Sequence, residues 1–422
     1  MQYGCIGEHL PHSFSKIIHE KIESYDYILK ELTSDEVAPF MIGKDFSGIN
    51  VTIPYKQTVI PFLDEIDEGA KRIGAVNTVV NRDGKLYGYN TDFGGLSALI
   101  DRIGIDLTGK KALIIGTGGT AKTAHAVAET RGAREILHIS IAGEEGTITY
   151  TEAMGDHTDA EIILNTSPCG MFPRVDTYPS APDGTPLDLD LFTRLEGCAD
   201  VVYNPLRTRF VLEARKRGIP AEGGLYMLVA QAVFAAEHFT GKRYPRSLID
   251  EIFTSLVAEK ENIVLVGMPG SGKSTVSRKL EALLPRSATD TDALIVEKAG
   301  KPISDIFARE GEGAFRDMES AVIKELAGET VKIIATGGGA ILREENLDAL
   351  RQNGRLYFLD RPLEDLIPTD DRPLAGDVEA IKKRYAERYG IYTAVSDERI
   401  TDFSSPEETA KTVAELHRKK LR

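Results

Sequence analysis

The chain of 422 residues lacks tryptophan, has few cysteines and has no long hydrophobic run. It has no tryptophan and three cysteines, Cys5, Cys169 and Cys198, without a CxxC or Cys/His spacing. Such cysteines exclude a disulfide framework and a structural zinc, and they favour a reducing compartment. No run approaches the roughly 20 apolar residues that span a bilayer, and no signal-peptide pattern opens the chain. We therefore expect a cytoplasmic protein with no membrane partner.

Basic residues are also fewer than acidic residues. Lys and Arg number 51 against 65 Asp and Glu, which leaves a net charge of −14. Non-specific binding to nucleic acid relies on clustered cations, so we expect no nucleic-acid partner. Local arginines can still hold a small anionic substrate. The length predicts two or three domains, and 42% hydrophobic with 27% charged residues is typical of globular proteins.

Short apolar runs alternate with helical patterns along the chain, which predicts α/β architecture. The spacing of residues 224–241 predicts a buried helix, and 247–260 reads as a charged amphipathic helix without a flexible spacer after it. Strands are expected at YGCIG (3–7), KALIIG (111–116), EILHIS (135–140), AEIILNTSP (160–168) and DVVYNP (200–205). This alternation is typical of a doubly wound sheet.

The stretch IVLVGMPGSGKST at 263–275 matches the phosphate-binding pattern G-x-x-x-x-G-K-[ST]. An expected strand precedes it and an expected helix follows, which is the context that this loop needs. Backbone N–H groups of such a loop surround phosphates, the lysine contacts them, and the hydroxyl ligates Mg²⁺. The pattern predicts an ATP or GTP site and does not identify the acceptor. Its residues are Gly267, Gly270, Gly272, Lys273, Ser274 and Thr275.

Candidate acceptor-binding residues follow this loop. Asp290 and Asp292 are two apart, and so share a face if the chain is extended there. Arg316 and Glu319 have the i, i+3 spacing of a helix, and IIATGGGAIL ends an expected strand in three glycines. Taken singly, each has an ordinary structural explanation. In this order, GMPGSGKST, D-x-D, FRxxE, GGG, RPL and the Arg388–Tyr392 motif resemble shikimate kinase over residues 261 to about 400.

This resemblance implies a role for each matched residue. Asp292 would bind the ring hydroxyls and help to deprotonate the attacking one, and Asp290 would support Mg²⁺ through water. Arg372 would come from a mobile lid, whose segment LIPTDDRPLAG lacks the further arginine usual upstream of RPL. The residues implied to bind the substrate are Asp292, Arg316, Gly337, Gly338, Gly339 and Arg388.

A second glycine-rich turn, GTGGTA at 116–121, lies between an expected strand and helix. Alone it is a weak indication of a dinucleotide site, formed by Gly116, Gly118, Gly119, Thr120 and Ala121. The motifs HSFS, NVTIPYK, IGAVNT, GYNTD, NTSPCGM and GGLYMLVAQA accompany it in an uninterrupted order. Together they resemble shikimate dehydrogenase over roughly residues 3–241.

Ketone reduction needs a hydride donor and a group that protonates the nascent alkoxide. A pair of Lys56 and Asp92 suits this task, because the ammonium stabilises negative charge and the carboxylate orients it. The resemblance also implies that neutral donors bind the substrate. Ser13, Ser15 and Thr52 would contact its carboxylate, whereas Asn77 and Gln231 would contact its ring hydroxyls.

The expected cofactor of this half is NADP, with NAD also possible. The family commonly carries Asn-Arg-Thr where this chain has Ser140, Ile141 and Ala142, followed by Gly143, Glu144 and Glu145. Isoleucine cannot pair with the 2′-phosphate of NADP, and the glutamates repel it. Lys122, Arg131 or Arg134 remains available to reach the phosphate from another direction.

The product expected of the first half is the substrate expected of the second. We therefore predict a bifunctional enzyme of the shikimate pathway that reduces 3-dehydroshikimate and then phosphorylates shikimate with Mg²⁺ and ATP. Its expected domains are a substrate domain (1–92), completed by a helix at about 224–245, a Rossmann domain (93–223), closing helices and a linker (224–260) and a P-loop domain (261–422). A quinate-accepting dehydrogenase and a shikimate-sensing regulator stay open as alternatives. The chain is expected to be a monomer or a homodimer.

Overall fold

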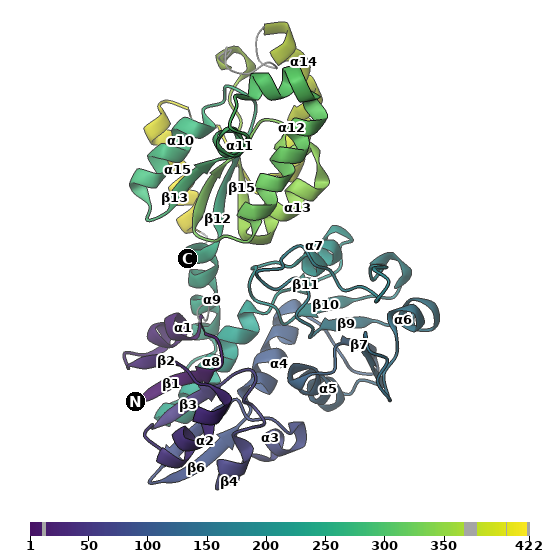
Figure 1. The fold of residues 1–422 in the computed structure, drawn as a ribbon, viewed down its shortest axis with the longest axis vertical. Coiled ribbons are helices and arrows are strands. Elements are labelled where there is room, and N and C mark those ends of the chain that lie inside the picture. The colour runs from purple at the N-terminus through teal and green to yellow at the C-terminus, as the bar shows by residue number, and fades with distance from the viewer. Residues whose placement is uncertain (11–13, 367–377, 402, 420–422) are drawn as a thin grey trace. The chain divides into compact units, whose positions relative to one another are not determined.

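The computed structural model describes residues 1–10, 14–366, 378–401 and 403–419 (Figure 1). They form two compact units. Unit 1 comprises Met1–Met171, Thr177–Asn204 and Phe210–Phe253, and unit 2 comprises Phe172–Asp176, Pro205–Arg209 and Thr254–Arg422. The finer domain limits at residues 92, 223 and 260 stay predictions.

The first sheet of unit 1 is mixed and has six strands in the order β2-β1-β3-β5-β6-β4. Ile6, Ile49, Val79 and Leu86 are fully buried in the core beside it, as the apolar runs predict. Strand β1 is parallel to β2 and β3, whereas β5 is antiparallel to β3 and β6. The strands are β1 (Tyr3–Gly7), β2 (Tyr27–Glu31), β3 (Gly48–Val51), β4 (Glu65–Ile66), β5 (Thr78–Arg82) and β6 (Lys85–Tyr89), and the helices among them are α1 (Ser15–Ile22), α2 (Ser34–Gly43), η1 (Ile60–Phe62) and α3 (Glu68–Ile73).

The second sheet of unit 1 is parallel throughout, in the order β11-β10-β9-β7-β8. Its strand order reverses at β7, which makes the turn after β7 the expected place for a ligand. The predicted strand at 200–205 is wrong: β10 ends at Asp200, whose Oδ1 accepts the N–H of Val202 at 2.9 Å and turns the chain. The elements are β7 (Lys111–Ile115), α5 (Gly119–Thr130), β8 (Glu135–Ile139), α6 (Tyr150–Asp156), β9 (Ile162–Asn165), η2 (Leu189–Leu191), β10 (Gly197–Asp200), α7 (Arg209–Lys216) and β11 (Ala221–Glu222).

Two long helices, α4 (Thr91–Ile103) and α8 (Leu225–Thr240), pack together between the two sheets of unit 1 (Figure 1). Glycine permits their close approach, because a Cβ at Gly95 would stand 2.7 Å from the carbonyl oxygen of Met227. Helix α8 is apolar on most of its surface and buried, as its spacing predicts. The predicted charged helix is α9 (Ser247–Lys260).

Unit 2 is built on a parallel sheet in the order β13-β14-β12-β15-β16. Helices α10 and α15 cover one face, and α12 and α13 cover the other (Figure 1). The predicted α/β class and P-loop architecture are therefore confirmed. The elements are β12 (Asn262–Val266), α10 (Lys273–Leu283), β13 (Ser287–Asp290), α11 (Thr291–Ala299), α12 (Ile303–Ala327), β14 (Lys332–Ala335), η3 (Ala340–Leu342), α13 (Glu344–Asn353), β15 (Gly354–Leu359), η4 (Leu363–Asp365), α14 (Val378–Val395), β16 (Glu398–Ile400) and α15 (Pro406–Lys419).

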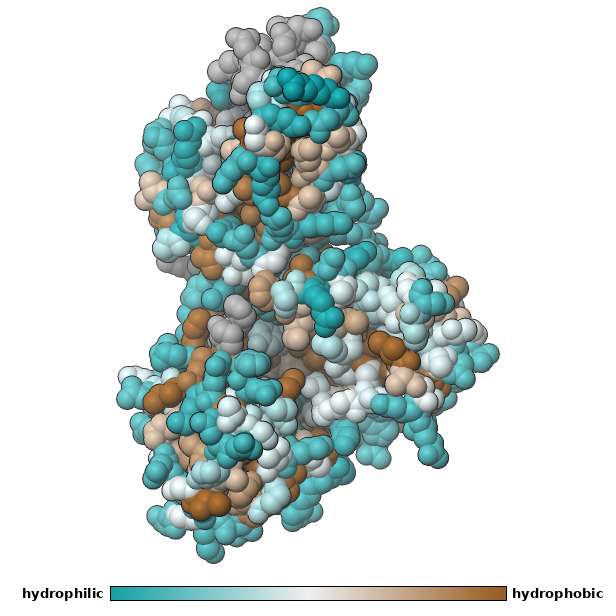
Figure 2. Space-filling model, viewed as in Figure 1, coloured by the Kyte–Doolittle hydropathy of each residue, from teal (hydrophilic) through white to brown (hydrophobic). Residues whose placement is uncertain are grey.

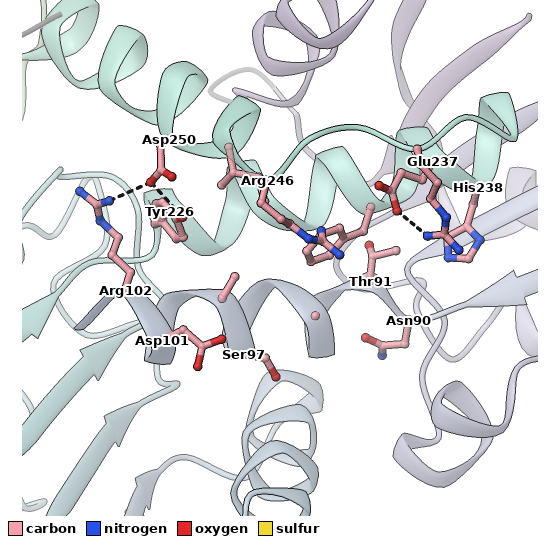
Figure 3. Close-up of a pocket in the computed structure, with 15 residues that line it drawn as sticks. Asn90, Thr91, Ser97, Asp101, Arg102, Tyr226, Glu237, His238, Arg246 and Asp250 are labelled. Carbon is pink, nitrogen blue, oxygen red and sulfur yellow. Dashed lines mark hydrogen bonds and ion pairs between the residues drawn. The ribbon is translucent and has the colours of Figure 1, made fainter. Parts of the chain in front are cut away.

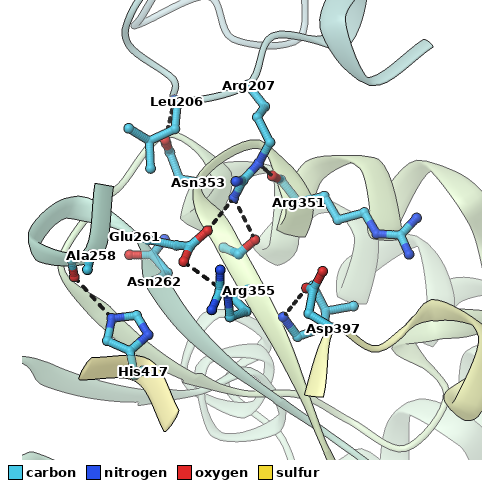
Figure 4. A network of polar contacts seen from close by, with 12 residues as sticks. Leu206, Arg207, Ala258, Glu261, Asn262, Arg351, Asn353, Arg355, Asp397 and His417 are labelled. Carbon is cyan, nitrogen blue, oxygen red and sulfur yellow. Dashed lines mark hydrogen bonds and ion pairs between the residues drawn. The ribbon is translucent and has the colours of Figure 1, made fainter. Parts of the chain in front are cut away.

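A polar network lies at the amino ends of β12 and β15 in unit 2 (Figure 4). The buried carboxylate of Glu261 accepts from Arg207 Nη2 at 2.8 Å and lies 3.3 Å from Arg355 Nε. Arg207 also donates to the carbonyl oxygens of Arg351 and Gly354, at 2.8 and 3.0 Å. Segment Pro205–Arg209, distant in sequence, is thus bound to the rest of unit 2, and its Arg207 neutralises a buried charge.

Polar residues cover most of the face seen in Figure 2, and hydrophobic residues are scattered among them. Scattered exposed apolar side chains are normal for folded proteins. Within the described ranges, no helix combines the length and the apolar character needed to cross a bilayer.

Candidate active sites

Lys56 and Asp92 meet in unit 1. Lys56 lies in the loop after β3, and Asp92 lies in the first turn of α4. Lys56 Nζ donates to Asp92 Oδ2 at 2.6 Å, and the two side chains are 21% and 11% exposed. The helix N-terminus favours the negative charge of Asp92. A partly buried ammonium held by a carboxylate is able to give a proton to a substrate oxygen.

Asn77 and Gln231 converge on Thr91, the residue before Asp92. Asn77 Oδ1 accepts the N–H of Thr91 at 2.7 Å, and Asn77 Nδ2 donates to Thr91 Oγ1 at 3.0 Å. Thr91 Oγ1 in turn donates to Gln231 Oε1 at 3.3 Å. Thr91 stands within the motif GYNTD, whose spacing does not reveal that this residue joins α8 to the loop before β5.

The three residues expected around the substrate carboxylate are only partly described. Thr52 follows β3 and is half-buried, and its N–H donates to the carbonyl oxygen of Ile6 at 3.0 Å. Ser15 is the first residue of α1 and is also half-buried. Ser13 lies outside the described residues. Tyr203, which belongs to none of the motifs, contacts the ring of Phe14 with the ring centres 5.4 Å apart.

The turn between β7 and α5 has the form of a phosphate cradle. Gly116 has φ 113°, and a Cβ there would stand 3.0 Å from Thr166 Oγ1, so this position needs glycine. Gly118 precedes the first residue of α5, Gly119, and a Cβ at either would meet no atom within 4 Å. The open backbone and the helix N-terminus fit the pyrophosphate of a dinucleotide. Thr120 and Ala121 continue the first turn of α5.

A pocket of about 850 Å³ lies elsewhere in unit 1, between α4, α8 and α9 (Figure 3). Its lining includes Thr91 but neither Lys56 nor Asp92. Arg246 lies 4.2 Å above the ring of Phe234, and Arg102 donates to Asp250 Oδ1 at 3.1 Å. The residues suited to ketone reduction therefore meet at the pair of Lys56 and Asp92 and not in this pocket.

In unit 2, the phosphate-binding loop has the backbone form that its glycines permit. Gly267, Gly270 and Gly272 have φ values of 151°, 81° and 93°. Lys273 Nζ donates to the carbonyl oxygens of Gly267 and Met268 at 2.8 and 2.9 Å, so the lysine side chain lies against the loop. Lys273 opens α10, followed by Ser274 and the exposed Thr275. The loop and the helix N-terminus fit a chain of phosphates.

Asp290 is the extended last residue of β13, whereas Asp292 lies in the first turn of α11, so the condition of an extended chain through both residues is not met. Asp290 caps α11, and its Oδ1 accepts the N–H groups of Asp292 and Ala293 at 3.0 and 3.3 Å. The other oxygen of Asp290 accepts from Ser274 Oγ. Both aspartates and Ser274 line a pocket of about 640 Å³. A hydroxyl beside a carboxylate next to a phosphate loop fits Mg²⁺, which keeps phosphate and water as its other ligands.

The glycine triplet 337–339 brings the other substrate-binding candidates together. A Cβ at Gly337 would stand 2.6 Å from both Asp292 Oδ1 and Glu319 Oε1, and one at Gly339 would stand 2.2 Å from Arg316 Nη1. Close approach to these side chains therefore requires residues without a Cβ. Arg316 Nη1 donates to Glu319 Oε2 at 2.7 Å. Burial raises the pKa of Glu319.

Arg388 and Tyr392 close this site from α14. Arg388 Nη1 donates to the carbonyl oxygen of Gly338 at 2.8 Å, and only 7% of Arg388 is exposed. The Tyr392 hydroxyl lies 2.6 Å from the same oxygen and 2.9 Å from the carbonyl oxygen of Gly267. Tyr392 thus connects the triplet to the phosphate-binding loop, a role that its place in the motif did not reveal. Arg372 lies outside the described residues.

These sites define two classes of enzyme. A parallel sheet with a dinucleotide-type turn and a lysine–carboxylate pair is typical of an oxidoreductase. A P-loop beside an aspartate and two buried arginines is typical of a small-molecule kinase.

Comparisons with known proteins agree with this division. Residues 5–79 match the shikimate dehydrogenase substrate binding domain, and residues 269–418 match shikimate kinase. Shikimate dehydrogenase (NADP(+)) of Geobacillus kaustophilus is 37% identical over 262 residues, which cover 57% of this chain and 92% of the relative. A crystal structure of a chorismate mutase/shikimate 5-dehydrogenase fusion protein from Clostridium acetobutylicum is 32% identical with a TM-score of 0.55, over 60% of this chain and 96% of that one. Shikimate 5-dehydrogenase of Thermus thermophilus, in complex with NADP(H) and shikimate, is 26% identical with a TM-score of 0.52, over 60% and 99%.

The chain belongs to the shikimate dehydrogenase family, and its C-terminal part is a shikimate kinase domain. It is a bifunctional enzyme with both activities. Both resemblances drawn from the motifs are therefore confirmed.

Proposed function

We propose that Lys56 is the proton donor of the dehydrogenase and that Asp92 holds it in place. The contact of 2.6 Å between Lys56 Nζ and Asp92 Oδ2 carries this proposal. NADPH, when bound, supplies the hydride that adds to the carbonyl carbon of 3-dehydroshikimate. The carbonyl π electrons move to oxygen, Lys56 Nζ gives that oxygen a proton, and solvent returns a proton to the amine. Asp92 holds the ammonium and aims it at the oxygen.

The neutral side chains around this pair would select the substrate. Asn77 and Gln231 are held by Thr91, so their remaining hydrogen-bonding atoms have defined directions. A site that hydrogen-bonds a hydroxyl strongly rejects an analogue that lacks it. Thr52, Ser15 and Ser13 complete the proposed set, with the substrate carboxylate as their partner.

The kinase site phosphorylates shikimate, with ATP as phosphoryl donor and Mg²⁺ as the ion that neutralises the phosphates. We assign the grip on the substrate carboxylate to Arg316 and Arg388, whose planar guanidinium groups suit a carboxylate. Asp292 accepts the proton of the attacking hydroxyl. Lys273 and the loop N–H groups hold the phosphates, Ser274 and Asp290 hold Mg²⁺, and Arg372 stabilises the transferred charge.

Further proposals concern the whole chain. The net charge of −14 supports the absence of a nucleic-acid partner, and three free cysteines support a reducing, cytoplasmic location. A monomer or homodimer is proposed, with domain limits near residues 92, 223 and 260.

One experiment tests the combined function. The purified chain receives 3-dehydroshikimate, NADPH and Mg²⁺-ATP, and the products are identified by mass. We expect shikimate when ATP is withheld and shikimate 3-phosphate when it is present. Unchanged 3-dehydroshikimate in both reactions would contradict the dehydrogenase assignment, and shikimate that accumulates with ATP present would contradict the kinase assignment.

A further inference from the structure

The loop after β8 offers no cation to a 2′-phosphate. Ile141 is 61% exposed at the position where the family commonly has arginine, and the exposed Glu144 and Glu145 follow it. Carboxylates beside the ribose repel a phosphate and suit a free 2′-hydroxyl. If NADPH is the reductant, as in the proposed function, a cation from another element has to balance this loop.

Two of the three candidate cations, Arg131 and Arg134, lie at the edge of the parallel sheet that is far from the glycine turn. Arg131 follows the last residue of α5, and a helix of 12 residues is roughly 18 Å long at 1.5 Å per residue. Arg131 also donates to Asp101 Oδ1 and to the carbonyl oxygen of Ser97. Arg134 precedes β8 and donates to Glu161 Oε2 at 2.9 Å. Both arginines therefore lie at the amino edge of the parallel sheet, opposite the glycine turn.

The third cation, Lys122, lies at the correct edge. His125 of α5 contacts His138 of β8, with Nδ1 and Nε2 3.0 Å apart, so this face of α5 is turned toward β8. Lys122 is three residues before His125 and shares that face. Helix α5 returns antiparallel to the strands, so one turn toward its N-terminus is one turn toward the carboxyl edge of β8. This is the level of Ser140 and the loop that follows.

Lys122 is also available for a ligand. Its residue is exposed, and it takes part in no ion pair within the described part of the chain. By contrast, Lys110, Lys111 and both arginines considered above are bound to carboxylates. A lysine with a flexible stem and no competing carboxylate is suited to a phosphate that arrives with the cofactor.

We propose that Lys122 binds the 2′-phosphate of NADPH and is the residue that makes this dehydrogenase prefer NADPH. The inference rests on the proposed dehydrogenase function. The family commonly has an arginine in the loop after β8. In this chain Lys122, from the first turn of α5, takes the place of that cation. Because Glu144 and Glu145 oppose it, the preference over NADH is smaller than an arginine in the loop would produce.

Equilibrium binding of the full chain tests this role without catalysis. The fluorescence of the reduced nicotinamide reports dissociation constants for NADPH and NADH, and added 2′,5′-ADP displaces NADPH. The Lys122→Met variant should weaken NADPH and 2′,5′-ADP about tenfold, while NADH changes less than twofold. Added salt should weaken NADPH binding to the wild type more than to the variant. The control is Lys85→Met, which removes another exposed lysine, from β6, and should leave both constants unchanged.

The outcomes separate this inference from the function on which it rests. A variant that binds NADPH as tightly as the wild type overturns the role of Lys122 and leaves the dehydrogenase assignment intact. An equal loss for NADPH and NADH overturns it too, because the lysine then acts on the shared pyrophosphate. A wild type that binds neither dinucleotide contradicts the proposed function itself.

Discussion

Lys56 Nζ and Asp92 Oδ2 are 2.6 Å apart although 36 positions separate the residues in sequence. The loop after β3 supplies the lysine, and the N-terminus of α4 supplies the carboxylate. Asn77 binds both the N–H and the hydroxyl of Thr91, which holds the first turn of α4 beside the loop before β5, and in that loop the N–H of Val76 donates to the carbonyl oxygen of Lys56 at 2.9 Å. The pair is therefore positioned by a hydrogen-bonded frame, and its chemistry depends on two elements that meet only in the folded chain.

The two activities should be separately removable. Lys56→Ala should lower ketone reduction at least about a hundredfold, because the proton donor is lost, and should leave phosphorylation of added shikimate unchanged. Asp292→Asn should do the reverse. Steady-state rates of both reactions in each variant provide the measurement, with circular dichroism as the control for folding. A folded variant that loses both reactions would falsify the assignment to two sites.

A methyl group at residue 339 should weaken the binding of shikimate to the kinase site. Gly339→Ala places a Cβ 2.2 Å from Arg316 Nη1, so the guanidinium has to move away from its place beside the triplet. We expect the KM for shikimate to rise by roughly tenfold or more, since a misplaced arginine loses a charge-assisted contact. The matched control is Gly313→Ala on α12, where a Cβ meets no atom within 4 Å. Equal KM values for the two variants would contradict the proposed role of Arg316.

An arginine placed after β8 should increase the preference for NADPH. Ile141→Arg provides a guanidinium where the exposed isoleucine now stands, and one charge-assisted contact corresponds to roughly a tenfold change in preference. The ratio of kcat/KM for NADPH and NADH measures it at fixed ionic strength. Ile42→Arg adds the same charge at a comparably exposed position on α2 and should leave the ratio unchanged. An Ile141→Arg ratio equal to that of the wild type would show that this loop does not meet the 2′-phosphate.

The kinase unit should lose stability in mild acid through His417. Burial, with the positive charge of Arg286, lowers the pKa of His417 from 6.5 to about 4. In the unfolded chain, His417 therefore binds a proton below about pH 6.5. In the folded chain it binds this proton only below about pH 4. Stability is full above pH 6.5 and falls by up to about 1.4 kcal/mol per pH unit between these values. Calorimetric unfolding of the wild type and His417→Gln between pH 7 and 5 measures the difference. Parallel pH dependences in the two proteins would contradict it.

Much of the site chemistry was open to prediction because it is encoded in short stretches. The glycines and lysine of 267–273 specify a phosphate loop through local backbone requirements, and the spacing of residues 247–260 predicted a helix with the bounds that α9 has. The strand expected at 200–205 failed because a local side-chain contact of Asp200 ends β10 earlier than the apolar run suggests. Asp290 and Asp292 would share a face only in extended chain, and α11 begins between them, so the helix cap at Asp290 decides their geometry.

The sequence by itself determined the α/β class, the two enzyme families and the candidate site residues, since these follow from periodicity and from motifs a few residues long. Only the tertiary structure decided which of those residues meet. It joined Lys56 to Asp92, placed Thr91 between Asn77 and Gln231, and excluded Arg131 and Arg134 from the cofactor edge. It also assigned Arg207 to the buried Glu261 of unit 2. Contacts of this kind depend on how distant elements pack, and packing minimises buried charge and empty volume over the whole chain, which no short stretch encodes.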